Sequence, residues 1–212
     1  LPSVAPFDGA DGRYVTNPVC VAVPGTETTP PIVLDMATSK IAAGKVRVAL
    51  NKGEALPPDT VIDAAGRPST DPSVLYTSPR GALLPIGEHK GSGLALICEI
   101  LAGALTGGGT IQDQNMRKDG IINNMLSLVI DPGRLVDTEW LGTEIDALIA
   151  FVKDSPPAAE GIPVMVAGDP ERAARIVRDR DGIVIDDTTW SGIVDAVGSL
   201  GLTGEEIKSA LS

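Results

Sequence analysis

Aromatic residues, cysteine and histidine are all scarce in this chain of 212 residues. Aromatic side chains make up 3% of it, so the core has to be built from valine, isoleucine, leucine and alanine, with close backbone packing at some of the 24 glycines. Two cysteines cannot form a disulfide framework, and both Cys20 and Cys98 stand in apolar runs, which predicts buried thiols in a reducing compartment. With one histidine, His89, and no Cys-x-x-Cys pair, the sequence offers no metal site.

Positive charge is also in short supply. The chain carries 17 basic and 28 acidic residues, which gives a formal net charge of −11. Nucleic acids and anionic membrane surfaces attract proteins through a positive field, so neither is expected as a partner. An anionic ligand would need a locally positive site, formed by helix N-termini and a few well-placed lysines or arginines.

Long apolar runs and a signal-peptide pattern are missing as well. No run approaches the roughly 20 apolar residues of a membrane-spanning helix, and the first residues do not resemble a secretory leader. These features favour a cytoplasmic enzyme. The sequence begins at Leu1 without an initiator methionine, and both a trimmed chain and a partial sequence fit this start.

Apolar runs bounded by proline and glycine indicate where strands lie. Residues 19–24 and 31–36 predict two strands joined by a polar loop, and residues 125–131 and 163–166 predict two more. Helical patterns separate these runs. This alternation of strands and helices is typical of an α/β fold.

Apolar spacing and capping residues predict the helices. One helix is expected from about residue 39 to 50, and residues 91–105 form another whose apolar residues cover nearly every face, so that it should be buried nearly all round. Residues 51–85 are rich in proline, glycine and aspartate without a sustained period, which is typical of a long loop. Further helix starts are expected at Thr143 with Asp146, at Asp169 with Pro170, near Thr188, and at Thr203 with Glu206.

The segment from Val33 to Ser39 combines an apolar strand with polar residues at its end. The strand, expected to be buried, carries the carboxylate of Asp35, and the hydroxyls of Thr38 and Ser39 lead into the following helix. Hydroxyls and free N–H groups at a helix start suit a phosphate or an amide. The alternative is an ordinary strand followed by a helix cap.

The segment Gly87–Gly93 is a glycine-rich turn that leads into the most apolar helix of the chain. It carries His89 and Lys90 where the helix begins. Glycine allows close backbone approach, lysine supplies charge, and imidazole donates or accepts a proton near neutral pH. This concentration of charge and glycine at a helix N-terminus favours a ligand site over a solvated turn.

Three further features have a plain structural interpretation. Gly168-Asp169-Pro170 opens a helix, as an ordinary N-cap would. The glycine-rich run 106–110 follows a helix instead of preceding one, which is typical of a helix C-terminus and turn. Glu99 stands within an apolar helix, either as a buried acid with a raised pKa or, more commonly, as a partnered structural carboxylate.

Taken together, these segments resemble the malate/L-lactate dehydrogenase-like oxidoreductases, which include ureidoglycolate dehydrogenase, sulfolactate dehydrogenase, diketogulonate reductase and piperideine-carboxylate reductase. No segment is specific alone, but together they match the family in register. Val15 stands where glycine is usual, and Ser92 replaces a frequent tyrosine. The matching stretches are residues 5–9, 16–18, 31–39, 87–91 with the following helix, 168–171 and 182–183.

The resemblance implies a core that binds NAD or NADP over residues 1–212, in an α/β fold with a mixed sheet and flanking helices that is unlike the Rossmann domain. The sequence agrees, because no G-x-G-x-x-G follows an expected strand. The implied reaction passes a hydride between nicotinamide and C2 of a small 2-hydroxy or 2-oxo acid, or a cyclic imine analogue, in a homodimer.

The resemblance also assigns site residues. Thr16 and Asn17 are expected near the substrate or the nicotinamide. The family's proton-transferring histidine belongs to an N-terminal helical segment upstream of Leu1, and His89 belongs to a different motif, so the catalytic residue is expected outside this sequence. The residues expected at the dinucleotide are Val33, Leu34, Asp35, Met36, Ala37, Thr38, Ser39, His89, Lys90, Gly168, Asp169 and Pro170.

Three hypotheses for the function stay open on these residues. The first is the dehydrogenase, with its N-terminal segment supplied by the rest of the gene or by a separate chain. The second is a truncated, non-catalytic relative that keeps the dinucleotide site. The third is an oligomerisation scaffold, suggested by the apolar residues 91–105 and the few aromatics. The substrate, and the choice between NAD and NADP, are also open.

Overall fold

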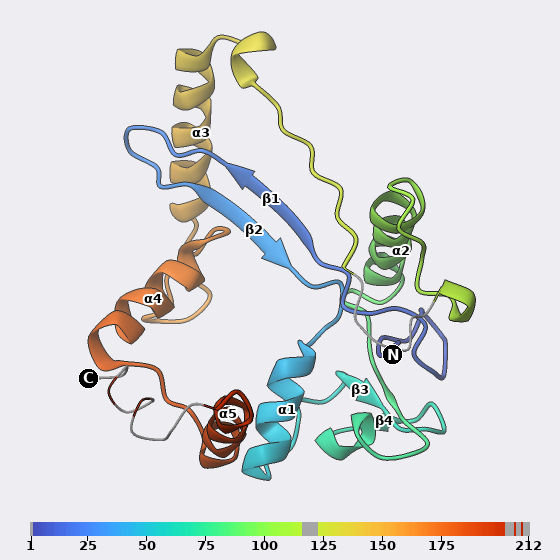
Figure 1. Ribbon diagram of the computed structural model, residues 1–212. Coiled ribbons are helices and arrows are strands. Elements are labelled where there is room, and N and C mark those ends of the chain that lie inside the picture. The colour runs from blue at the N-terminus through green and yellow to red at the C-terminus, as the bar shows by residue number, and fades with distance from the viewer. Residues whose placement is uncertain (1, 116–122, 202–205, 207–208, 210–212) are drawn as a thin grey trace. The chain divides into compact units, whose positions relative to one another are not determined.

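The computed structural model describes residues 2–115, 123–201, 206 and 209 (Figure 1). The chain forms two compact units that are each discontinuous in sequence. Unit 1 comprises Leu1–Thr16, Ser39–Ser92 and Ile183–Ser212, and unit 2 comprises Asn17–Thr38 and Gly93–Gly182. Helices and strands occur together, which confirms the α/β class. Within the described residues both sheets are antiparallel, and the parallel pairing is a single bridge between Val4 and Leu83.

The stretch that the sequence predicts to be a long loop contributes part of the core of unit 1, so that prediction is wrong. Residues 51–85 contain three two-residue strands, β3 (Val61–Ile62), β4 (Pro68–Ser69) and β5 (Ala82–Leu83), in the order β4-β3-β5. The 3-10 helix η1 (Pro72–Leu75) precedes β5. Strands this short have no sequence period, yet the side chains of β3 and β5 are buried. The core consists of Val4, Val46, Ala49, Leu56, Val61, Leu75 and Leu83.

Helix α1 (Ala43–Lys52) begins four residues later than the sequence predicts. Ser39 pairs with Pro85 in an isolated bridge, and the Lys40 N–H donates to the Leu84 carbonyl. The chain bends at residues 40 and 41, and Ala42 has the extended backbone of an N-cap. The helix ends at Gly53, whose left-handed backbone, with φ of 68°, lets its N–H close the last turn.

Helix α5 (Asp187–Ser199) confirms the helix expected near Thr188. The Asp186 carboxylate caps it by accepting a hydrogen bond from the Thr189 N–H, 2.9 Å away. α5 packs against α1 within unit 1 (Figure 1), where the Asn51 amide donates to the Thr189 hydroxyl. The capping box expected at Thr203 and Glu206 lies outside the described residues, because Thr203 is not among them.

Unit 2 contains the hairpin of β1 (Val19–Val23) and β2 (Ile32–Met36), which confirms the first two expected strands. The residues expected as strands at 125–131 and 163–166 belong to no strand of the described chain, so those two predictions are wrong. A strand needs a hydrogen-bonded neighbour, which its own sequence cannot supply. Cys20 lies exposed on β1, against the expectation of a buried thiol.

Two more helices belong to unit 2: α3 (Thr138–Lys153) and α4 (Asp169–Asp181). α3 begins five residues before the expected Thr143, because the Asp137 carboxylate accepts from the Trp140 N–H and caps the helix. Thr143 therefore lies inside α3 and donates its hydroxyl to the Glu139 carbonyl.

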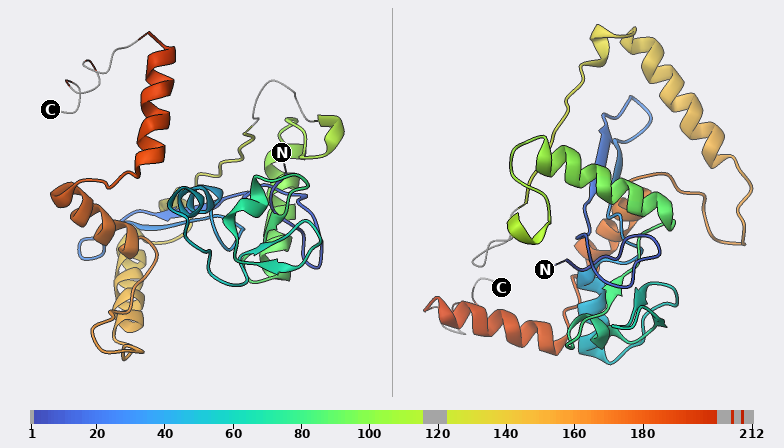
Figure 2. Two further views of the ribbon diagram at one scale, coloured as in Figure 1. Left: turned by 90° about the horizontal axis from the view of Figure 1, so that it is seen from below. Right: turned by 90° about the vertical axis from the view of Figure 1, so that its right-hand side faces the viewer.

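Helix α2 (His89–Cys98) continues into the π-helical segment η2 (Glu99–Ala104) as one rod, green in Figure 2. The helix expected at 91–105 is confirmed, but the expectation that it is buried nearly all round is wrong. Leu96 and Ile97 are nearly half exposed, and Leu105 is 68% exposed. An apolar helix sequence favours burial, but it does not show which residues would cover the helix. No helix among the described residues is both long and apolar enough to cross a membrane.

Candidate functional site

The segment from Val33 to Ser39 changes from exposed to buried along its length. Val33 and Leu34 are exposed on β2, against the expectation of a buried strand, and Asp35 is exposed opposite Cys20. Thr38 and Ser39 are almost fully buried.

The Ser39 hydroxyl donates to the Ile41 carbonyl at 2.9 Å. Because α1 begins only at Ala43, these hydroxyls do not lie at a helix start. Their expected position at a helix N-terminus is therefore wrong.

The segment Gly87–Gly93 does open a helix, as the sequence predicts. Gly87 and Glu88 both have a φ of 57°, and the chain then enters α2 at His89. The His89 ring meets the ring of Phe7 edge-on, with centroids 5.8 Å apart. The N–H of Phe7 donates to the Ser92 hydroxyl at 3.1 Å. Two contacts therefore fix the start of α2 against the first residues of unit 1.

Lys90 brings positive charge to this helix start. Its side chain is exposed, and none of the described carboxylates lies within ion-pair distance of it. A cation without an internal partner, next to the free N–H groups of a helix start, provides local attraction for an anion in a negatively charged chain.

The turn Gly168–Pro170 joins three elements of unit 2. Gly168 precedes α4 with a φ of 93°, so Asp169 is the first residue of the helix and not its N-cap as expected. The Asp169 carboxylate forms ion pairs with Lys153, at 2.9 Å, and Arg172, at 2.6 Å, and accepts from the Val166 N–H at 3.0 Å. Arg172 also donates to the Pro31 carbonyl ahead of β2, at 2.8 Å.

These contacts hold the pKa of the Asp169 carboxyl far below its usual range, first through the Lys153 ammonium and then through the Val166 N–H and Arg172. The carboxylate is thus occupied inside the protein. It shapes the turn and is not an unpaired charge facing a ligand. Lys153 and Pro31 could not be predicted as partners from the sequence, since only Arg172, three residues along the same helix, lies at a spacing that sequence can reveal.

Replacing Gly168 with alanine is expected to lower the free energy of unfolding by about 2 kcal/mol. A positive φ is unfavourable for alanine, and its Cβ would lie 2.7 Å from Arg172 Nη1 and displace that side chain. Gly53→Ala is the matched control, because Gly53 has a φ of 68° but open space around it. Urea unfolding followed by circular dichroism measures both. Equal losses in the two variants would show that the Arg172 contact is unimportant.

Asn17 and Glu99 meet in unit 2. The Asn17 amide donates to Glu99 Oε1 at 2.9 Å, and Glu99 Oε2 accepts from the Ile111 N–H at 2.8 Å. Of the two interpretations of Glu99, the partnered structural carboxylate is therefore the one that the geometry supports. Burial and the neighbouring Glu99 charge raise the pKa of the Cys98 thiol, which is half-buried.

The expected cofactor residues are divided between the two units. Those from Val33 to Thr38 and the turn Gly168–Pro170 belong to unit 2, where Arg172 links the two segments through Pro31. Ser39, His89 and Lys90 belong to unit 1.

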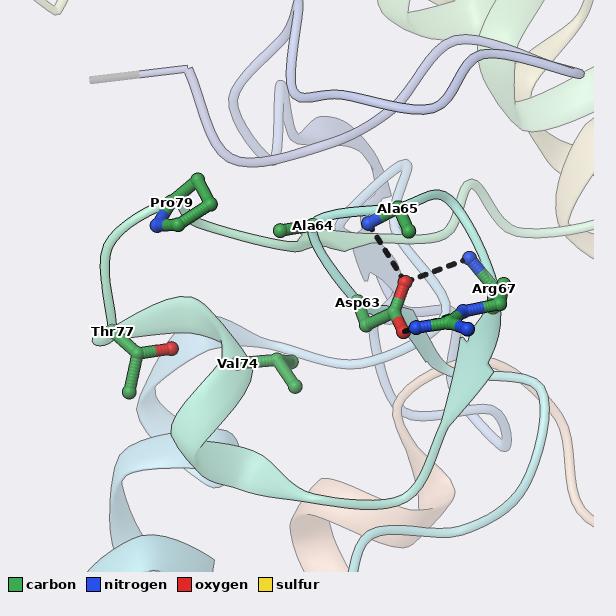
Figure 3. A pocket seen from close by; sticks show the side chains of 7 residues that line it. All are labelled: Asp63, Ala64, Ala65, Arg67, Val74, Thr77 and Pro79. Carbon is green, nitrogen blue, oxygen red and sulfur yellow. Dashed lines mark hydrogen bonds and ion pairs between the residues drawn. The ribbon is translucent and has the colours of Figure 1, made fainter.

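A pocket of unit 1 contains none of these residues (Figure 3). In it the Asp63 carboxylate pairs with the Arg67 guanidinium at 3.0 Å, so the pocket offers no uncompensated charge to an anion. Its lining comprises Asp63, Ala64, Ala65, Arg67, Val74, Thr77 and Pro79. Among the described residues, no group of three or more histidine, cysteine or acidic side chains is arranged to hold a metal ion.

The sequence model of the malate/L-lactate dehydrogenase family matches residues 1–194. Hydroxycarboxylate dehydrogenase B of Escherichia coli K12 is 40% identical over 211 residues, which cover 99% of this chain and 58% of that protein. L-Lactate dehydrogenase of Cupriavidus necator is 40% identical over 199 residues, covering 94% and 57%. The structure of sulfolactate dehydrogenase from Methanocaldococcus jannaschii superposes with a TM-score of 0.68 at 30% identity, covering 97% and 58%. The chain thus spans less than two thirds of the length of these relatives.

Proposed function

Because the chain belongs to the malate/L-lactate dehydrogenase family, we propose that it forms the nicotinamide-dinucleotide-binding core of an oxidoreductase acting on small 2-hydroxy acids. The family match over residues 1–194 is the observation that carries this proposal. Three of the relatives are named as dehydrogenases of a hydroxy acid but differ in the acid, so the proposal extends to the class of substrate and not to one compound.

The proposed cofactor site comprises the segments that the sequence predicts to bind the dinucleotide. Residues 33–39 and the turn Gly168–Pro170 would contact the dinucleotide, with Asp169 shaping the turn through its two ion pairs. His89 and Lys90 would contact it at the start of α2, where Lys90 supplies positive charge to the pyrophosphate or to a ribose phosphate. In this arrangement an anionic cofactor meets local positive charge, although the net charge of the chain is −11.

The fold proposed for this site differs from the Rossmann domain. In a Rossmann domain, a glycine-rich turn between a parallel strand and a helix holds the pyrophosphate. Here β2 is paired antiparallel with β1, and residues 37–42 separate it from α1 without a G-x-G-x-x-G sequence.

The cofactor, when bound, supplies the hydride chemistry. The residues of this chain bind and orient it, and the Lys90 ammonium stabilises its negative charge. No residue of the 212 is assigned the proton transfer. His89 lies against Phe7, in the segment proposed to bind the cofactor, and is not proposed to transfer the proton.

Replacing Lys90 with methionine is expected to weaken NADH binding about tenfold or more, because one charge-assisted contact is lost. Titration of NADH and NADPH, followed by nucleotide fluorescence, measures the affinity and shows which nucleotide the protein prefers. Lys45→Met is the matched control, since Lys45 is an exposed lysine of α1 in the same unit. Wild-type protein that binds neither nucleotide would overturn the proposed function.

A further inference from the structure

Asn17 is an amide side chain whose orientation is fixed by its neighbours. It is 8% exposed and has a φ of 31°, in the left-handed region. Its Nδ2 donates to the Ala95 carbonyl at 3.0 Å and to Glu99 Oε1 at 2.9 Å. A carbonyl and an ionised carboxylate can only accept, so a rotated amide would turn Oδ1 against two acceptors. The nitrogen must therefore face inward.

Glu99 is itself held in place. Its second oxygen accepts from the Ile111 N–H, so both carboxylate oxygens have fixed donors. Glu99 is also the first residue of η2, where the Leu105 N–H donates to the Ile100 carbonyl five residues earlier. Such π-helical turns inside α-helices are frequent at functional sites. The π-helical turn, the Glu99 carboxylate and the Asn17 amide are thus joined in one hydrogen-bonded network.

The remaining polar atom of the amide, Asn17 Oδ1, has no hydrogen-bond donor among the described residues. It is not sealed in the interior, because no fully buried side-chain nitrogen or oxygen in the described structure lacks a partner. A side chain more than nine-tenths buried therefore directs one acceptor to an accessible position. Ordering an amide in this way has an entropic cost that a solvated surface residue would not bear.

We infer that Glu99 is a positioning residue that holds Asn17 Oδ1 ready to accept a hydrogen bond from an N–H or O–H donor of a bound ligand. This inference rests on the proposed function, which supplies two donors of that chemistry: the carboxamide N–H of the nicotinamide and the hydroxyl of the 2-hydroxy acid. A 2-oxo acid has no such hydroxyl. The acceptor would therefore distinguish either the cofactor from its analogues or the reduced substrate from the oxidised one.

Two variants separate the acceptor from the group that positions it. Asn17→Gly removes the amide, and glycine accepts a φ of 31° without strain. Glu99→Gln keeps the size of the side chain but leaves one acceptor oxygen for two donors, Asn17 Nδ2 and the Ile111 N–H. Each variant is expected to weaken binding of the ligand that supplies the donor about tenfold. Glu144→Gln, at an exposed position of α3, is the control and should leave binding unchanged.

Two pairs of probes identify the donor. The first pair is NADH and its 3-acetylpyridine analogue, which has a methyl ketone in place of the carboxamide. The second pair avoids turnover: L-lactate is titrated into the protein with NADH, and pyruvate into the protein with NAD⁺, by calorimetry. If Asn17 accepts from the carboxamide, Asn17→Gly and Glu99→Gln weaken only NADH. If it accepts from the hydroxyl, they weaken only L-lactate.

Hydrogen exchange of the Asn17 side-chain amide, followed by NMR, tests the positioning without any ligand. We expect slow exchange in the wild type and selectively faster exchange in Glu99→Gln, with the main-chain amides of unit 2 unchanged apart from that of Ile111, which donates to the same carboxylate. Unchanged exchange, or equal losses for both members of each probe pair, would overturn the inference while the proposed function stands. Absence of any nucleotide binding by the wild type would instead overturn the proposed function, and with it the ligand role of Asn17.

Discussion

Replacing Gly81 with alanine is expected to lower the free energy of unfolding by roughly 3 kcal/mol or more. A Cβ at this position would overlap the carbonyl oxygen of Ile62 and lie 3.1 Å from its carbonyl carbon. Ile62 belongs to β3, the central strand of the unit 1 sheet, where it pairs with Ala82. The Gly81 N–H also donates to the Val74 carbonyl at 2.7 Å, so the chain cannot move away without breaking that bond.

The matched control for Gly81 is Gly44, which lies in the first turn of α1 with nothing within 4 Å of an added Cβ. Gly44→Ala is expected to raise the free energy of unfolding by about 0.5 kcal/mol, because alanine has the higher helix propensity. Urea unfolding followed by far-ultraviolet circular dichroism compares the two variants. Similar effects of the two substitutions would contradict the close approach of Gly81 to β3.

Asp169→Asn is expected to lower the free energy of unfolding by about 2 kcal/mol at neutral pH. The neutral amide loses both ion pairs, with Lys153 and with Arg172. Asp169 is 18% exposed as a side chain, so these pairs are screened less than those on the open surface. Lys153→Met should lower the free energy of unfolding by less, because Asp169 then keeps its contacts with Arg172 and the Val166 N–H.

The contribution of the Asp169 carboxylate to the free energy of unfolding should decrease as the pH falls. Because its folded-state pKa lies well below the unfolded value of about 3.9, the carboxylate stabilises the folded protein above that value. The contribution is lost as pH falls further, toward the folded-state pKa. The stability difference between wild type and Asp169→Asn should thus be full at pH 6 and smaller at pH 3, as measured by urea unfolding. A difference that stays constant with pH would contradict the ion-pair explanation.

The hairpin and the start of α2 could be predicted from the sequence because their signals are local. Residues 19–24 and 31–36 are apolar runs on both sides of a polar loop, and the observed strands β1 and β2 lie within them. The glycines and charges of Gly87–Gly93 mark a helix start that the structure confirms at His89.

The core of unit 1 could not be predicted in this way. Val61 and Leu83 are fully buried, but each lies in a two-residue strand, which is too short to show a period. Their pairing is decided by residues far along the chain, such as Val4, which bridges to Leu83.

The contacts of the candidate site could likewise be predicted only where they are local in sequence. The helix start at Asp169 can be read from the proline that follows it, but the Lys153 partner comes from the end of another helix. The Asn17 amide and Glu99 are 82 residues apart in sequence, so no local pattern could join them. The assignment of cofactor residues stays a prediction that rests on the family resemblance.

The three-part make-up of unit 1 has a consequence for synthesis on the ribosome. Its first two segments end at Ser92, but α5, which packs against α1, is not made until the whole stretch Gly93–Gly182 has been translated. At about 5 to 20 residues per second, that delay is roughly 5 to 20 seconds. During it, the face of α1 that later receives α5 stays uncovered in the nascent chain. A chaperone that acts during translation is therefore expected to bind the segments of unit 1 that are translated first.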